Sequence, residues 1–426
     1  MELLWRVELE NGATVTGSTL MQPGENRIVC DLPDDTLKSV TGAMLWDTEP
    51  GERIFINGFQ SWTYSPECGV KDRTPSFASP LARSKPLGLE RYGDYYFTDY
   101  PETPGVTHGE SYAYWRRGEH FRLLGSLDES SGYTMIRYDA NAGKLTLSRD
   151  CCGVRCNGEF HVFDLFYAEG AEKEVYDGWF AAMGLPKKPA ERIAGYSSWY
   201  NRYQDIDEKC ILSDLSGCAG VLSEGDVFQI DDGWESGITA NSLRKSGGVW
   251  QGYYANDPDF WKVNPDRFPN GLEPIVEKAR EYGLEVGLWF GPDSSQEFAN
   301  VEKDIETIWG LYQRYGVRYF KLDGVKILSK RSEVRFIHML KELTRRSGGD
   351  IRFNLDVTAE DRFGYLYQTQ YGTLFVENRY TDFSNYYPHN TFKNLWSLSA
   401  VIPARRLQME LVNPRRNPER YGDLPF

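Results

Sequence analysis

The sequence predicts a multidomain α/β protein in which an N-terminal antiparallel β-sandwich (residues 1–185) precedes a (β/α)8 barrel of the TIM type (residues 186–426). Two observations predict this fold class. Short strand-like runs fill the first part of the chain, and alternating strand and helix patterns fill the rest. The length of 426 residues is enough for two or three small domains, or for one large barrel with a companion domain.

The N-terminal part consists of short alternating or aromatic runs such as ATVTGSTL, NRIVCDL, KSVTGAMLW and FHVFDLFYAE, with turn-forming residues between them. Short strands at close spacing are typical of an antiparallel β-sandwich. We expect the tryptophans Trp5, Trp46 and Trp115 to lie in its core. The segment GLPKKPAERIAG (184–195), with two prolines and a basic pair, is expected to link the domains.

Seven candidate strands follow the linker: GYSSW (195–199), DVFQID (226–231), EVGLWFG (285–291), VRYFKLD (317–323), IRFNLDV (351–357), TLFVEN (373–378) and RLQMELV (406–412). Helical spacing of apolar residues predicts helices that contain Leu272 to Ala279, Ile305 to Tyr312 and Phe336 to Leu343. Gly283, Gly316 and Gly348 follow where a C-cap glycine belongs. Alternating strands and helices require a parallel sheet, and seven such strands favour the barrel over a doubly wound sheet.

The strand count is one short of a closed barrel. Either one strand is missed, or the polypeptide stops before the barrel closes, near its seventh strand. We expect the second explanation, and therefore a barrel that lacks its C-terminal end.

Composition excludes several classes of function. A net charge of −14, with only isolated basic pairs, argues against nucleic acid as a partner. The chain has no signal-peptide pattern and no apolar run long enough to span a bilayer, so we expect a cytoplasmic protein without a membrane partner. Seven cysteines without a CxxC pair and five scattered histidines predict free thiols, no metal site and no cofactor. The sequence leaves open whether the protein is a homo-oligomer.

Polar side chains recur where the predicted barrel strands end. The strand ends carry Asp231, Asp232, Trp289, Asp293, Lys321, Asp323, Asn354, Glu377, Arg379 and Asp382. In such barrels the chemistry takes place at the C-terminal ends of the strands, so these groups are expected to converge on one rim. Other interpretations are a helix N-cap for Asp293, a structural ion pair for Lys321 and Asp323, and magnesium binding by the aspartates.

A rim rich in carboxylates and aromatic residues suits the hydrolysis of a glycosidic bond. One carboxylate attacks the anomeric carbon, and a second carboxyl group, which its surroundings keep protonated, donates a proton to the leaving oxygen. The aromatic content of 14%, with 12 Trp and 27 Tyr, is compatible with sugar binding as well as with core packing.

Four motifs resemble the barrel of the glycoside hydrolases of family 36, the α-galactosidases and their relatives. They are GYSSWYNRYQDI, DVFQIDDGW, the long segment from FWKVNPDRFPNG to EVGLWFGP, and VRYFKLDG. The match around them covers nearly all of residues 191–330 and then becomes weaker. The NGFQSW stretch (57–62) resembles the loop that the N-terminal domain of this family extends over the active site. The order Q-I-D-D, W-x-x-x-P-x-x-F-P-x-G and Y-F-K-x-D is the specific part of the match.

The resemblance implies a retaining α-glycosidase that acts on an oligosaccharide or another glycoside. Asp323 stands where the family has its nucleophile, and Lys321 where a lysine binds the sugar and favours the ionised carboxylate. Asp231 and Asp232 stand where a carboxylate pair takes the hydroxyls at positions 4 and 6 of galactose. The resemblance also implies that Trp289 and Tyr200 line the sugar pocket and that Trp62 closes it.

The acid/base is expected to be Asp382 in the RYTD motif, because Arg379 then takes the place of a sugar-binding arginine of the family. Glu377 is the alternative. In a retaining enzyme the two catalytic carboxyl groups lie roughly 5 to 5.5 Å apart.

The chain departs from the family after its fifth barrel strand. Asn354 and its neighbours occupy the region where the family has a cysteine and glycines near position 2 of the sugar. Galactose therefore cannot be separated from N-acetylgalactosamine on sequence. Transfer of galactose to another sugar, as in raffinose-synthase-like relatives, and carbohydrate binding without turnover are the further alternatives.

Overall fold

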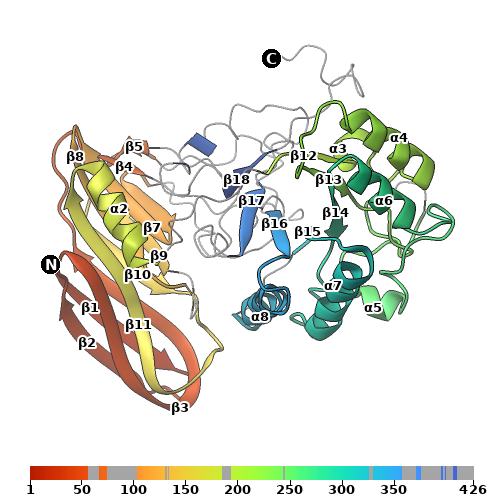
Figure 1. Ribbon diagram of the computed structural model, residues 1–426. Helices are drawn as coiled ribbons and strands as arrows, with labels where there is room; N and C mark the ends of the chain where they lie inside the picture. The colour runs from red at the N-terminus through yellow and green to blue at the C-terminus, as the bar shows by residue number, and fades with distance from the viewer. Residues whose placement is uncertain are drawn as a thin grey trace. The chain divides into compact units, whose positions relative to one another are not determined.

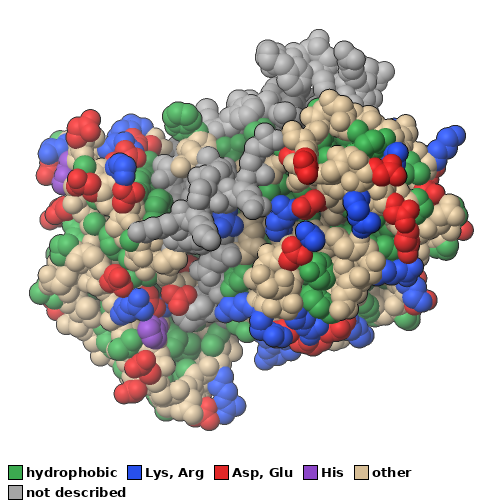
Figure 2. Space-filling view, viewed as in Figure 1, with side chains coloured by type: hydrophobic (Ala, Val, Ile, Leu, Met, Phe, Trp, Pro, Cys, Tyr) green, Lys and Arg blue, Asp and Glu red, His purple; other side chains and the backbone are tan. Residues whose placement is uncertain are grey.

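The computed structural model of the chain describes residues 1–55, 67–73, 103–129, 132, 134–184, 193–242, 245–325, 330–356, 371–375, 395–396, 399 and 406–409. These residues form two compact units. One contains the described residues up to Gly184 together with 395–396 and 399, and the other contains those from Ile193 to Phe375 together with 406–409. Figure 2 shows acidic and basic side chains interspersed on the visible face of each unit. None of the described helices has the length and apolar character needed to cross a membrane.

The first unit contains an antiparallel sheet, coloured red to yellow in Figure 1. Its strands are β1 (Glu2–Leu9), β2 (Thr14–Leu20), β3 (Gly24–Leu45), β4 (Arg53–Phe55), β5 (Glu67–Gly69), β6 (Val106–Glu110), β7 (Tyr112–Arg117), β8 (His120–Ser126), β9 (Thr134–Asp139), β10 (Lys144–Arg149) and β11 (Arg155–Gly170). The strand order is β5-β4-β7-β8-β11-β3-β10-β9-β6, and β1 pairs with both β2 and β3. The predicted antiparallel character of this part is confirmed.

Strand β3 differs from the prediction. The runs NRIVCDL and KSVTGAMLW were expected as separate strands, but they are one strand of 22 residues. Its first half pairs with β11 as far as Thr36, and its second half pairs with β1 and β10. Pro33, which has no N–H group to donate, lies where the register with β11 shifts between Cys156 and Gly158. A bulge tolerates proline because the ladder is already interrupted there.

A helix that the sequence reading missed completes the first unit. Helix α2 (Glu172–Ala182) follows β11 directly and packs its buried side chains, among them Trp179, toward the sheet. The Trp179 indole N–H donates to the carbonyl oxygen of Ser126 at 3.0 Å. Gly125 leaves room for the ring, because a Cβ atom there would lie 2.5 Å from it. Neither a strand nor a helix was expected for these 11 residues.

The core of the first unit confirms two of the three expected tryptophans. Trp46 and Trp115 are almost fully buried and their rings lie 4.3 Å apart between centroids. Trp5 is only partly buried against the same cluster of Leu, Ile, Val and Phe side chains. Burial of such large rings is a major favourable term in the folding of this unit.

The second unit contains a parallel sheet, green to blue in Figure 1. Its strands are β12 (Gly195–Ser197), β13 (Val227–Ile230), β14 (Glu285–Phe290), β15 (Tyr319–Leu322), β16 (Arg352–Asp356), β17 (Gly372–Phe375) and β18 (Leu407–Gln408). Each strand pairs in parallel with the next one in the chain. All seven predicted strands are therefore confirmed, together with the parallel arrangement.

Helices lie around the parallel strands (Figure 1). They are α3 (Trp199–Arg202), α4 (Glu208–Cys218), α5 (Tyr253–Asn256), α6 (Glu273–Glu281), α7 (Val301–Tyr315) and α8 (Lys330–Arg346). The three helices expected from apolar spacing correspond to α6, α7 and α8. Gly316 ends α7 with a φ of 69°, and Gly283 and Gly348 also have positive φ values just beyond α6 and α8. Glycine adopts this conformation without the steric cost that a side chain adds.

Candidate active site at the strand ends of the parallel sheet

Asp323 follows strand β15, and contacts with strand β14 and with the next residue in the chain fix its position. Its backbone N–H donates to the carbonyl oxygen of Phe290 at the end of β14 (3.1 Å). The Trp289 indole N–H donates to Oδ2 at 3.0 Å, and the Gly324 N–H donates to Oδ1 at 2.7 Å. The side chain remains 25% exposed. Hydrogen bonds therefore fix the Asp323 carboxylate while part of it stays accessible, and a nucleophile requires both.

Lys321 is buried on β15 and lies between two carboxylates. Its Nζ donates to Oδ2 of Asp231 at 3.3 Å and lies 3.8 Å from Oδ2 of Asp323. The ammonium also lies 5.8 Å from the ring centroid of Tyr200 and 5.4 Å from that of Phe375. The expected pair of Lys321 with Asp323 is present, but the shorter contact is with Asp231. One cation therefore links the ends of β13 and β15.

The adjacent aspartates after β13 serve different groups. Asp231 accepts from Gln229 Nε2 at 2.7 Å, and its backbone N–H donates to Oγ of Ser198 at 2.8 Å, so it belongs to the cluster around Lys321. Asp232 is fully buried, and its carboxylate accepts from Gln204, Thr239 and Asn241. Consecutive residues at a strand end point to opposite sides, which separates the two carboxylates.

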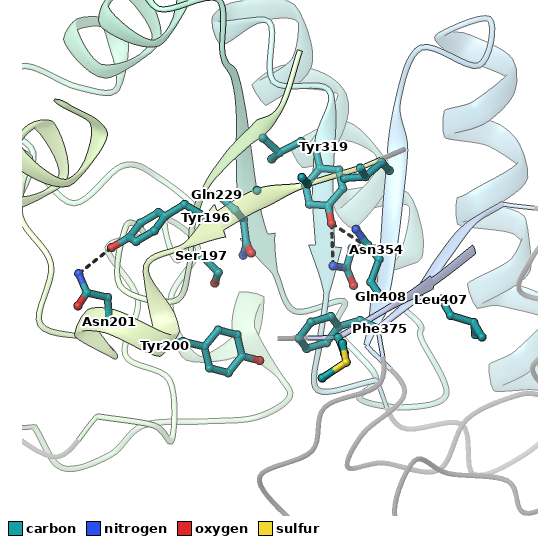
Figure 3. A pocket seen from close by; sticks show the side chains of 15 residues that line it. Tyr196, Ser197, Tyr200, Asn201, Gln229, Tyr319, Asn354, Phe375, Leu407 and Gln408 are labelled. Atoms are coloured by element: carbon teal, nitrogen blue, oxygen red, sulfur yellow. Dashed lines mark hydrogen bonds between the residues drawn. The ribbon is translucent and has the colours of Figure 1, made fainter. Parts of the chain in front are cut away.

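A cavity of about 660 Å³ opens beside this cluster (Figure 3). Residues of β12, β13, β15, β16, β17 and β18 and the α3 turn line it, among them Ser197, Tyr200, Gln229, Asn354 and Phe375. We call Asp231, Lys321 and Asp323 the charged cluster. Ser197 and Gln229 hydrogen-bond to Asp231, and the rings of Tyr200 and Phe375 lie near the Lys321 ammonium. Asp323 itself does not line the cavity. The cavity therefore adjoins the charged cluster from the side of β12 and β18.

Asn354 presents a carbonyl oxygen that accepts no hydrogen bond within the described part of the chain. The side chain is 4% exposed and lines the cavity. Its Nδ2 donates to the Tyr319 hydroxyl at 2.7 Å, and this hydroxyl donates to Gln408 Oε1 at 3.2 Å. Figure 3 shows this connection between β16, β15 and β18. A buried acceptor without a partner is costly unless a ligand or water satisfies it.

Tyr319 and Gln408 are site residues that the sequence reading missed. The signal for Tyr319 was available, because it stands two positions before Lys321 and alternate residues of a strand face the same side. Gln408 carried no such signal, since its partners Tyr319 and Thr373 lie on other strands.

Asp293 does not cap a helix, contrary to one interpretation of the sequence. Helix α7 begins at Val301 with Asn300 at the N-cap position. Asp293 is fully buried and accepts from the backbone N–H groups of Gly252 and Ser295 and from Nδ2 of Asn300. It therefore fixes the loop after β14.

Asp304 on α7 also supports this loop. The Asp293 N–H donates to Asp304 Oδ2 at 2.9 Å, and the Tyr254 hydroxyl donates to Oδ1 at 2.8 Å. Burial raises the pKa of Asp304 to about 8, against an ordinary value of 3.8.

Four of the predicted site residues lie outside the described residues. They are Trp62, Glu377, Arg379 and Asp382. The remaining seven are described. Six of these come together at the ends of the strands: Asp323, Lys321, Asp231, Trp289, Tyr200 and Asn354. The side chain of Asp232 points away from them and hydrogen-bonds to a separate set of buried side chains.

Comparison with known proteins points to one family. No family model matches the chain. α-Galactosidase C of Emericella nidulans is 31% identical over 107 residues, which are 23% of this chain and 12% of that protein. α-Galactosidase mel1 of Schizosaccharomyces pombe is 25% identical over 200 residues, which are 42% of this chain and 39% of that protein. The chain thus spans less than half the length of these curated relatives.

Solved structures agree with this result. TtGalA, an α-galactosidase from Thermus thermophilus in complex with stachyose, superposes with a TM-score of 0.57 at 18% identity over 99% of both chains. The chain shares the fold of α-galactosidases. A variant of AgaA, a family 36 α-galactosidase from Geobacillus stearothermophilus in complex with 1-deoxygalactonojirimycin, gives a TM-score of 0.56 at 13% identity over 95% of this chain and 67% of that one. The resemblance to family 36 that the motifs indicated is confirmed.

Proposed function

We propose that the chain is the catalytic part of a retaining α-glycosidase that hydrolyses terminal α-galactosides. The observation that carries this proposal is the cluster at the end of β15. Asp323 is held by the Trp289 indole and the Gly324 N–H, with the Lys321 ammonium 3.8 Å away and one face accessible. The α-galactosidases that resemble the chain support the choice of substrate class.

In the proposed reaction, Asp323 attacks the anomeric carbon and forms a glycosyl-enzyme intermediate. Asp382 protonates the departing oxygen, and then acts as a base toward the water that releases the sugar. The hydrogen bonds from Trp289 and Gly324 orient the attacking carboxylate before the substrate arrives, which lowers the entropic part of the barrier. In this proposal Lys321 and Asp231 bind hydroxyl groups of the same sugar.

Glu377 is the alternative acid to Asp382. Replacement of the true acid is expected to slow substrates with poor leaving groups strongly, whereas activated aryl glycosides, which need little protonation, lose less. Comparing Asp382→Asn with Glu377→Gln on both kinds of substrate assigns the role. Equal behaviour of the two variants would contradict any assignment to Asp382.

The anomeric form of the first product tests the mechanism. With an aryl α-galactoside followed by proton NMR, a retaining enzyme releases α-galactose first, and mutarotation follows later. Initial release of β-galactose would exclude double displacement and Asp323 as the nucleophile.

The buried acceptor of Asn354 keeps a second substrate in consideration, α-linked N-acetylgalactosamine. Asn354 lines the cavity, and its Oδ1, which accepts no hydrogen bond within the described residues, needs a donor that either a hydroxyl or an acetamido N–H supplies. Parallel assays with aryl α-galactoside and aryl α-N-acetylgalactosaminide separate the two. Product analysis with acceptor sugars present distinguishes hydrolysis from galactosyl transfer. If calorimetry shows that the protein binds sugar but no aryl α-glycoside is hydrolysed, the chain is a carbohydrate-binding protein.

The wider architecture is part of the same proposal. We infer a β-sandwich domain over residues 1–185, and a (β/α)8 catalytic barrel over residues 186–426 that needs a further strand beyond the seven described. The unbroken parallel order from β12 to β18 supports the barrel. A cytoplasmic location stays a prediction, which fractionation tests, and light scattering decides the oligomeric state that the sequence leaves open.

A further inference from the structure

A tryptophan outside the groups described above lies against the residue that follows Asp323. Trp250 belongs to the long loop between β13 and α5. A Cβ atom at Gly324 would lie 3.2 Å from Cε3 and 3.5 Å from Cζ3 of its ring, so the indole approaches the Gly324 backbone closely. The N–H of Gly324 is the group that donates to Oδ1 of Asp323 at 2.7 Å. The Trp250 ring therefore borders the residue next to the proposed nucleophile.

Hydrogen bonds on both sides fix the backbone of Trp250. Its carbonyl oxygen accepts from the hydroxyl of Tyr253 at 3.0 Å, and Tyr253 is 0% exposed. On one side, the Val249 N–H donates to a backbone carbonyl of the same loop at 3.0 Å. On the other side, the Gly252 N–H donates to Oδ1 of the buried Asp293 at 2.7 Å. The ring is therefore carried by a fixed part of the loop.

Trp250 differs in burial from other tryptophans near the strand ends. Trp234, Trp261 and Trp289 are between 0% and 6% exposed, so core packing accounts for them. Trp250 is only partly buried, although its backbone is fixed. A fixed tryptophan with an accessible part offers a large apolar surface to a ligand at a low cost in conformational entropy. This combination suits a binding residue.

Trp250 and Lys321 approach Asp323 from different sides. Lys321 lies 3.8 Å from Oδ2, whereas Trp250 lies against the residue that donates to Oδ1. Trp250 does not line the cavity that adjoins the charged cluster, and residues 245–247 of its own loop are exposed. The ring therefore lies toward the outside of the site. If the terminal sugar binds at the charged cluster, the part of the glycoside beyond that sugar is the part that can reach Trp250.

We propose that Trp250 is a specificity-determining residue whose ring binds the apolar ring face of the leaving group of the glycoside. This inference rests on the proposed function, in which the terminal sugar binds at the charged cluster. Trp250 takes part in no bond making or breaking. Its contact favours substrates whose leaving group contains a ring over substrates whose leaving group is small, because binding energy from a remote part of the substrate contributes to kcat/KM.

Kinetics with two leaving groups test the inference. Trp250→Ala should lower kcat/KM for phenyl α-galactoside at least about tenfold, and kcat/KM for methyl α-galactoside less than about twofold. Trp250→Phe keeps an aromatic ring and should lie between the wild type and Trp250→Ala. Trp309→Ala, at a partly buried tryptophan of α7, is the matched control and should discriminate between the two substrates as the wild type does. Equal losses on both substrates in Trp250→Ala would overturn the inference.

Binding to the Asp323→Asn variant separates this inference from the proposed hydrolysis. Calorimetry compares the phenyl and methyl α-glycosides of galactose, N-acetylgalactosamine and glucose. For a sugar that binds, the phenyl glycoside should bind more tightly than the methyl glycoside, and adding Trp250→Ala should reduce this preference at least about tenfold. An unchanged preference, or no binding of any of these glycosides, would overturn the inference. If the preference depends on Trp250 but the wild type hydrolyses none of the glycosides, only the proposed function is refuted.

Discussion

The two units of the chain bury their large side chains for different purposes. In the first unit, buried Trp46, Trp115 and Tyr138 pack among aliphatic residues, and aromatic contacts connect them, such as the tilted contact of the two tryptophan rings with centroids 4.3 Å apart. In the second unit, the interior of the parallel strands carries Lys321 and Asn354, each buried. The second unit also buries large aromatic side chains such as Trp289, but it gives up some of the stability gained from burial to hold these polar groups in place.

This difference shows where function resides. A buried ion pair adds little net stability, because the loss of hydration offsets the attraction between the charges. Lys321 and Asp231 have side chains only 4% and 2% exposed, yet they connect to a carboxylate that is 25% exposed. Such an arrangement is useful for binding and chemistry. Substitutions in the first unit should therefore lower the free energy of unfolding, whereas substitutions in the charged cluster of the second unit should lower turnover.

The largest expected effect is on turnover, from Asp323→Asn. Loss of the nucleophile should reduce kcat by about 10⁴-fold or more, while the free energy of unfolding changes little because Lys321 keeps Asp231 as a partner. Steady-state kinetics and urea unfolding measure the two quantities. Asp259→Asn, on an exposed turn, is the control and should leave both unchanged. If Asp323→Asn retained its activity, Asp323 would not be the nucleophile, and the second unit would not differ from the first in this way.

The opposite behaviour is expected for Trp115→Ala in the first unit. The side chain is fully buried, so its removal should cost about 3–5 kcal/mol of unfolding free energy. Trp5→Ala is the matched control and should cost clearly less, because Trp5 is only partly buried. Urea unfolding followed by circular dichroism measures the difference. Similar losses in both variants would mean that Trp115 is not part of a close-packed core.

Asp304→Asn should change how stability depends on pH. Because the pKa of Asp304 is about 8 in the folded chain and near 3.8 when unfolded, the folded state holds an extra proton between these values. Stability should therefore fall as the pH rises across this interval, by up to about 1.4 kcal/mol per pH unit. In Asp304→Asn the slope should flatten, as urea unfolding at pH 5, 6.5 and 8 would show. Exposed Asp177→Asn should keep the wild-type slope.

The smallest expected effect belongs to Asn354→Leu, which removes the acceptor without changing the volume greatly. Affinity for galactose should fall about 10- to 100-fold, as expected when a buried donor of the ligand loses its acceptor. Calorimetry with galactose and its 2-, 3-, 4- and 6-deoxy analogues measures the loss. One analogue should bind equally to both proteins and so identify the hydroxyl group. Asn256→Leu on the surface is the control. If the affinity fell equally for galactose and for all its analogues, Asn354 would contribute to the shape of the pocket and would not accept a hydrogen bond from the sugar.

Much of the second unit was predictable because its signals are local. The strand-like runs, apolar helical spacing and terminal glycines depend on residues a few positions apart, and all seven strands follow from them. The convergence of Asp231, Lys321 and Asp323 was predictable for a related reason. Parallel strands place their C-terminal ends on one edge, so polar residues that end successive strands meet.

The first unit was predicted less well because its features depend on distant partners. Continuity of β3 through Pro33 depends on a register shift opposite β11, which lies more than 120 residues later in the chain. This signal is not contained in the segment itself. Helix α2 did carry a local signal, since its buried Val175, Tyr176 and Trp179 have helical spacing, but the segment is short.

The sequence alone therefore determined the strand order, the residues at the strand ends and the resemblance to family 36, since each depends on local pattern or motif. Only the tertiary structure decided how these residues pair. It joined Lys321 more closely to Asp231 than to Asp323, turned Asp232 toward Gln204, Thr239 and Asn241, and linked Asn354 through Tyr319 to Gln408. The physical reason is that hydrogen-bond partners are set by side-chain direction and burial, which bring together residues up to 90 positions apart.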